Sequence, residues 1–155
     1  MRTINLTKSG DYVVKLSKPG DTVLICSAIK ASGSENIVIN VTVIHQAPQT
    51  SAKTVMKAVV DDQALVHLNG SVIVKPGAQG ISSFLETRIL LLSEKAKAEA
   101  IPNLEIEAND VKCSHAATIG QVDDEQLFYL QSRGISNKQA KQMISEAFLN
   151  LKEIQ

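Results

Sequence analysis

Residues 105–134 read EIEANDVKCSHAATIGQVDDEQLFYLQSRG, and within them strand-like sequence gives way to helical sequence. The stretch contains Cys113, one of two cysteines, and His115, one of three histidines. If this segment is extended, both side chains lie on the same face of the strand. A thiolate beside an imidazole suits iron or zinc. The same spacing also occurs where a cysteine and a histidine merely pack in a core, so both interpretations stay open.

The composition bounds the class of protein. At 155 residues the chain predicts one domain with a sizeable core, built from aliphatic residues because only 3% of residues are aromatic. Sixteen basic and 16 acidic side chains give zero net charge, which disfavours a nucleic-acid-binding protein. No apolar run approaches the length of a membrane span. The N-terminus lacks an apolar signal core, and two distant cysteines do not form a disulfide framework, so we expect a cytoplasmic protein with reduced thiols.

Residues 1–121 carry a pattern of short strands. Pairs such as Pro19-Gly20 and Asn69-Gly70 separate the strand-like runs. Asn69-Gly70 between apolar runs is typical of a hairpin and favours an antiparallel sandwich. The scarcity of aromatic residues favours stacked parallel rungs around a narrow core, so two architectures remain. The predicted strands are 12–16, 22–29, 37–44, 54–60, 65–68 and 71–74.

Residues 122–155 predict two helices. Asp123 is the expected N-cap of the first, with Gln126 closing a capping box, and Gly134 is the expected end. Ser136 with Gln139 repeats the box at the second helix. The earlier segment 95–100, KAKAEA, has helix propensity, but Pro102 follows it closely, so we expect a strand or a connector there.

The second predicted helix carries one apolar stripe, formed by Ala140, Met143, Ile144, Ala147, Phe148 and Leu151. Three of the five aromatic residues, Phe128, Tyr129 and Phe148, lie in the helical pair. Such a face either packs on the β domain or docks a partner, and both interpretations stay open.

The string LLLSEKAKAEAIPNLEIEANDVKCSHAATIGQVDDEQLFYLQSRGIS resembles the C-terminal part of the SufB/SufD family, and SufD more closely. The resemblance is dense from Thr54 to Phe148, and its long irregular strings, such as NLEIEANDVKCSH, make it specific. It implies a right-handed parallel β-helix over 1–121 followed by a C-terminal helical pair over 122–155. It also implies a non-enzymatic scaffold subunit of SUF-type iron–sulfur cluster assembly.

The resemblance further implies site residues and partners. Cys113 and His115 would lie at the interface of two scaffold protomers, where an iron–sulfur cluster forms. The cluster would be transient, or the isolated protein would hold none. The partner protomer would be a SufB/SufD-like scaffold or a second copy. A SufC-like ABC-type ATPase would dock on the helices through Phe128, Tyr129, Met143 and Phe148. The alternative is a structural or regulatory paralogue that keeps the fold and its partners but assembles no cluster.

The chain departs from the family pattern in two ways. Ala116 stands where the family most often has glycine, and its methyl group would crowd a close backbone approach across the interface and so change the pairing geometry, not the fold. The chain is also short, so residues 1–53 are expected to form a cap or early rungs.

Other candidate residues are read from local sequence alone. Cys26 is expected in the core and His67 as a hydrogen-bonded structural residue. Glu105 and Glu107 could add oxygen ligands near Cys113, although exposed strand carboxylates are the default interpretation. The segment 77–80 lacks the Lys-Ser/Thr of a phosphate-binding loop, so nucleotide chemistry would belong to a partner.

Overall fold

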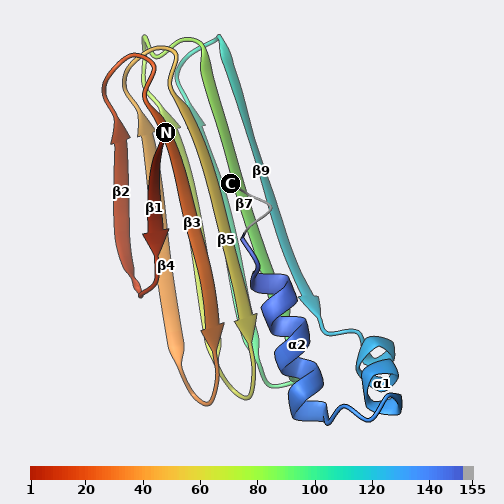
Figure 1. Ribbon diagram of the computed structural model, residues 1–155. Coiled ribbons are helices and arrows are strands. Elements are labelled where there is room, and N and C mark those ends of the chain that lie inside the picture. Colours follow the sequence, from red (N-terminus) through yellow and green to blue (C-terminus); the bar gives the residue numbers. More distant parts are fainter. Residues whose placement is uncertain (152–155) are drawn as a thin grey trace.

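The computed structural model describes residues 1–151, and the last four residues of the predicted helical segment 122–155 lie outside it. The described chain has nine strands followed by two helices (Figure 1). The elements are β1 Arg2–Leu6, β2 Gly10–Leu16, β3 Thr22–Ala31, β4 Asn36–His45, β5 Ser51–Val60, β6 Leu65–Val74, β7 Ile81–Leu91, β8 Lys97–Ile106, β9 Val111–Gln121, α1 Asp124–Ser132 and α2 Asn137–Leu149.

The strands form two parallel sheets. Sheet A has the order β1-β3-β5-β7-β9, and sheet B has the order β2-β4-β6-β8. Because consecutive strands alternate between the sheets, the chain winds as a flattened right-handed parallel β-helix of about four turns (Figure 1). The predicted β-helix with a C-terminal helical pair is confirmed, and the sandwich is excluded. Residues 1–53 supply strands of the same two sheets.

An internal repeat underlies the winding. From β2 onward, residues paired across neighbouring turns are 29 to 32 positions apart, as in Thr22 with Ser51 and Leu65 with Lys97. The connecting turns stack as well, since the amide of Gln49 donates to the carbonyl of Gln79 at 2.8 Å. The sequence analysis missed this repeat, although apolar, β-branched runs that recur about every 30 residues were the signal for it.

The core lies between the inner faces of the two sheets. Alternate residues of each strand point inward, and side chains such as Leu16, Ile25, Ile39 and Leu68 are fully buried. The sheets are close enough that aliphatic side chains fill the space, which explains the shortage of aromatic residues. Tyr12 and Ile4 pack against this core in the first turn.

The predicted hairpin at Asn69-Gly70 is wrong, because 65–68 and 71–74 belong to one continuous strand, β6. Gly70 faces the core, and a Cβ atom there would lie 2.7 Å from Leu85 Cδ1. Glycine is therefore needed for the close approach of Leu85 and not for a turn. Asn69 points outward and its amide donates to Asn40 Oδ1 at 2.8 Å, joining two turns.

The segment 95–100 enters a strand, as expected: a turn ends before Lys97, where β8 begins. Pro102 lies inside β8 without disrupting the sheet. This is possible because β8 is the last strand of sheet B and has a neighbour on only one side among the described residues.

The helix boundaries follow local capping signals. Asp123 is the N-cap of α1, but its carboxylate accepts from the amide of Glu125, at 2.9 Å, so the predicted capping box with Gln126 is wrong. Gly134, with φ 87°, ends the helix, and the amide of Ile135 donates to the carbonyl of Leu130. The capping box of Ser136 and Gln139 is confirmed at α2.

Helix α2 packs on the outer face of sheet A, against β5 and β3 (Figure 1). Lys57 Nζ donates to the carbonyl of Asn150 at 2.8 Å, and Lys141 pairs with Asp61 at 3.3 Å. The buried residues of this helix are Ala140 and Ser145, whereas Met143 and Ala147 are exposed. The predicted apolar stripe therefore coincides only in part with the side of α2 that packs on sheet A, because the side facing the sheet carries Lys141 and Ser145.

Cys26 is buried, as predicted, but not between the sheets. It pairs in register with Val55, and both side chains lie on the outer face of sheet A, the face that carries α2. Burial raises the pKa of this thiol, and the charge of Lys53 opposes that shift.

Candidate functional site

Strand β9 places Cys113 and His115 side by side. They pair in register with Ser83 and Leu85, two inward-facing residues of β7, so both side chains lie on the inner face of sheet A. The predicted same-face arrangement is confirmed. Because β9 is the last strand of its sheet, no further turn covers this face among the described residues.

The two side chains differ in burial. Cys113 is half-buried and packs against the core, whereas His115 is exposed. Burial raises the pKa of the Cys113 thiol, and a backbone hydrogen bond from Ser83 acts in the opposite direction. An accessible imidazole beside a partly sheltered thiol can present a nitrogen and a sulfur ligand together.

The other suggested ligands lie elsewhere. Glu105 and Glu107 approach Lys75 Nζ at 3.6 and 2.9 Å on the outer face of sheet B, so their suggested place beside Cys113 is wrong. The reason is that β8 belongs to the sheet opposite β9. Within residues 1–151, no cluster of three or more His, Cys, Asp and Glu side chains could hold a metal ion.

A buried polar network behind the pair escaped the sequence analysis. The ring of His45 is completely buried at the end of β4. Its Nδ1 lies 2.7 Å from Thr50 Oγ1, and its Nε2 lies 3.2 Å from Ser83 Oγ. His45 and Ser83 are 38 positions apart and share no motif, so only the winding of the chain brings them together. His67, as predicted, is hydrogen-bonded, with Nδ1 2.8 Å from Glu99 Oε2.

The buried ring predicts an acid sensitivity. Desolvation lowers the pKa of His45 from 6.5 to about 4. The unfolded chain therefore binds the proton more tightly than the folded protein does. The contribution of His45 to the stability of the fold is complete above pH 6.5 and is lost as the pH falls towards 4. We expect the free energy of unfolding to fall by about 2–3 kcal/mol because of this residue. Urea unfolding gives the free energy of unfolding at pH 7.5 and at pH 4.5. The difference between the two values should be smaller for His45→Gln than for wild type. Equal differences would show that His45 does not cause the acid sensitivity.

The helical pair presents apolar side chains away from the β-helix. Phe128, Tyr129 and Met143 are 72%, 57% and 48% exposed. Phe148 differs, because it is half-buried and the Arg88 guanidinium of β7 lies 5.5 Å from the centre of its ring. A shallow depression at α1 and α2 is lined by Tyr129, Leu130 and Ile144 with the polar residues Asp123, Glu125 and Gln126. Neither described helix is long and apolar enough to cross a membrane.

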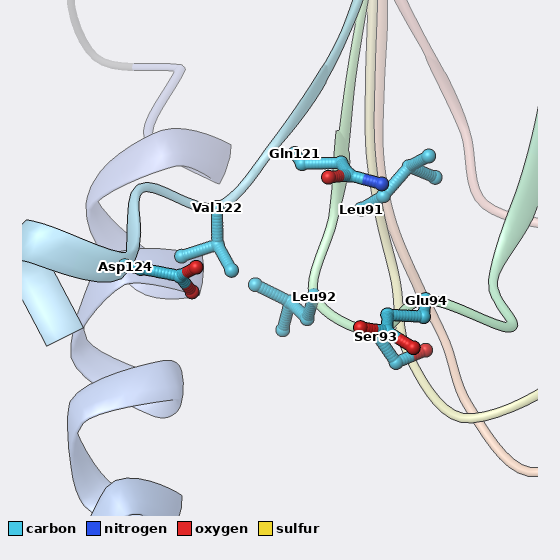
Figure 2. A pocket seen from close by; sticks show the side chains of 7 residues that line it. All are labelled: Leu91, Leu92, Ser93, Glu94, Gln121, Val122 and Asp124. Atoms are coloured by element: carbon cyan, nitrogen blue, oxygen red, sulfur yellow. The ribbon is translucent and has the colours of Figure 1, made fainter.

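A pocket marks the joint between the β-helix and α1. Figure 2 shows its lining side chains, which come from the end of β7 and the turn after it, from the end of β9, and from the start of α1: Leu91, Leu92, Ser93, Glu94, Gln121, Val122 and Asp124. The amide of Val122 donates to the carbonyl of Leu91 at 2.8 Å, which ties the joint to β7. The joint lies at the end of β9, roughly 30 Å along the strand from Cys113. The Cys-His pair and the helical surface are therefore well separated.

Comparison with known proteins identifies the fold's relatives. Residues 7–148 match the family described as SUF system FeS cluster assembly, SufBD core domain. The iron-sulfur cluster assembly protein SufD of Escherichia coli (strain K12) is 40% identical over 104 residues, which cover 67% of this chain and 25% of that protein.

Two further relatives match almost the whole chain. SufD of Bacillus subtilis (strain 168) is 33% identical over 95% of this chain and 31% of its own length. A SufBD family protein of Mycobacterium leprae (strain TN) is 32% identical over 96% of this chain and 41% of its own length. The chain thus spans between a quarter and two-fifths of the length of these relatives. With its parallel β-helix and its match over residues 7–148, the chain belongs to the SufB/SufD family of SUF-system iron–sulfur cluster assembly proteins.

Proposed function

We propose that this protein is a cytoplasmic, non-enzymatic scaffold subunit on which an iron–sulfur cluster is assembled. The observation that carries the proposal is the Cys113–His115 pair, which shares the inner face of the uncovered edge strand β9. The cluster is the cargo of the protein, and a thiolate and an imidazole are suitable ligands for it. Two side chains cannot complete the coordination of a cluster, so a second protomer supplies the remaining ligands.

The second protomer binds at the last turn of the β-helix. The last strands of the two sheets, β8 and β9, have neighbours on one side only within the described chain, and such edges are templates for pairing. The partner is a second copy of this chain or another SufB/SufD-like scaffold. A two-fold arrangement would place His115 near the corresponding residue of its partner.

Sedimentation equilibrium at micromolar concentration tests the dimer. We expect a dimer of the chain alone, or a heterodimer with a co-expressed scaffold, because edge pairing removes two unpaired strand edges from water. Lys substitution of Ala117, which is exposed on β9, should weaken the dimer. A monomer under both conditions contradicts this part of the proposal.

Cluster assembly is tested by comparing Cys113→Ser and His115→Ala with wild type during co-expression with the assembly machinery. We expect each substitution to lower cluster yield roughly tenfold or more, because each removes a ligand atom. The yield is read from visible absorption of protein purified without oxygen. Cys26→Ala and His67→Ala are matched controls, since these residues lie on the outer faces of sheets A and B.

The outcome separates two functions. Loss of the cluster with retained fold, checked by circular dichroism, supports the scaffold. If both variants assemble clusters as well as wild type, the pair has no ligand role, and the alternative of a structural or regulatory paralogue takes its place.

The helical pair docks an ABC-type ATPase of the SufC kind. What supports this part is the exposure of Phe128, Tyr129 and Met143 on helices of which only α2 packs closely on the β-helix. The alternative, that the apolar face serves only for packing on the β domain, fits Phe148 but not these three residues. ATP-driven movement of a partner docked on the helices would be transmitted to the joint between the β-helix and α1, at the end of β9.

A further inference from the structure

We infer that His45 is a positioning residue for Cys113, acting through the side chain and main chain of Ser83. The inference rests on the proposed role of Cys113 as a ligand. His45 ends β4 in sheet B, whereas Cys113 lies on β9 at the last turn of sheet A. Ser83 on β7 lies between them and contacts both.

The directions of the hydrogen bonds follow from Thr50. Its hydroxyl donates to the carbonyl of Ala47 at 3.2 Å, so its only proton is used. Thr50 Oγ1 must then accept from Nδ1–H of His45, across 2.7 Å. In a neutral ring this leaves Nε2 unprotonated, and Nε2 accepts the hydroxyl proton of Ser83 across 3.2 Å. The lowered pKa of the buried ring agrees with a neutral imidazole.

The side chain of Ser83 is thereby held by His45, while the main chain of Ser83 contacts the thiol of Cys113. It is buried, it is the register partner of Cys113, and its backbone makes a hydrogen bond to Cys113. Cys113 itself lies on an edge strand with no turn over it, so β7 is its only neighbouring strand in the described chain. Groups behind a ligand commonly fix its orientation, and their loss weakens binding by about 10- to 100-fold.

Two other buried hydroxyl groups of this core, those of Ser27 and Thr54, make no such network. Ser27 Oγ and Thr54 Oγ1 are buried without a hydrogen-bond partner among the described residues. Their presence shows that this interior tolerates unpaired hydroxyl groups, although each costs stability. Of the two hydroxyl groups that bond to His45, that of Ser83 lies opposite Cys113, and Ser27 offers a matched control on β3.

The test measures the rate at which iodoacetamide alkylates Cys113 at one fixed pH, with mass spectrometry separating Cys113 from Cys26. We expect Ser83→Ala and His45→Leu to raise this rate roughly tenfold, since a half-buried thiol on an edge strand becomes freer. Ser83→Thr retains the hydroxyl group, and His45→Gln retains an acceptor for it, so both should restore the wild-type rate. Ser27→Ala should leave the rate unchanged.

The conservative variants separate positioning from mere packing. The inference is overturned if Ser83→Ala, which removes a single oxygen atom, alkylates at the same rate as Ser27→Ala. It is also overturned if Ser83→Thr and His45→Gln fail to restore the rate while their circular dichroism matches wild type. If the rates respond as expected but wild type assembles no cluster, the positioning role stands and the proposed function fails.

Discussion

Replacing Phe128 and Tyr129 together with glutamate will abolish co-purification of the proposed ATPase partner while the β-helix remains folded. Both rings are largely exposed on α1, and Arg133 lies 5.3 Å from the centre of the Tyr129 ring. Exposed aromatic residues that become buried at an interface often contribute about 2–4 kcal/mol each, so one charged substitution should weaken binding about 30- to 1,000-fold. Two substitutions should bring the complex below detection.

The control is Val13→Glu. Val13 is 59% exposed on β2, in the first turn of the β-helix and far from α1 and α2 in the fold (Figure 1). Val13→Glu likewise places a glutamate at an exposed apolar position, and we expect this variant to leave ATPase binding intact. Affinity is measured by titration of purified partners, with circular dichroism as the check on folding. Unchanged affinity in the double variant, or binding that survives deletion of residues 122–155, would place docking elsewhere.

Replacing Gly70 with valine will destabilise the β-helix by about 1–3 kcal/mol or more. A Cβ atom at this position would lie 2.7 Å from both Cδ1 and Cδ2 of Leu85, which is buried between the sheets. The interior is close-packed, so the added carbons force either Leu85 or the strand to move. For a chain of this length, we expect the melting temperature to fall by roughly 2–4 °C for each kcal/mol.

Two further variants sharpen this test. A Cβ atom added at Gly120 on β9 would meet no other atom within 4 Å, so Gly120→Val should leave stability almost unchanged. Leu85→Ala alone should cost about 2–5 kcal/mol, because it leaves a cavity in the core. In the double variant with Gly70→Val the costs should be less than additive, since valine fills part of that cavity. Equal melting temperatures for Gly70→Val and Gly120→Val would show that the contact with Leu85 is unimportant.

Residue-level patterns predicted the parts of this structure that depend on neighbours in the chain. The caps at Ser136 and Gly134 and the side-by-side placement of Cys113 and His115 follow from interactions over a few residues. The parallel β-helix itself did not follow from periodicity, because short β-branched runs fit sandwiches and β-helices equally. The resemblance to the SufB/SufD family decided between these two architectures, since it depends on a match over many positions of the chain together.

What the sequence by itself determined is therefore the strand runs, the two capped helices and the candidate pair on β9. Only the tertiary structure decided that Gly70 is a point of close packing, that Phe148 lies against Arg88, and that His45 reaches Ser83. Each of these depends on residues far apart in sequence, which the winding of the two sheets or the packing of α2 on sheet A brings together. The physical reason is that a side chain's burial and partners are set by the adjacent turn or the facing sheet, which local sequence does not encode.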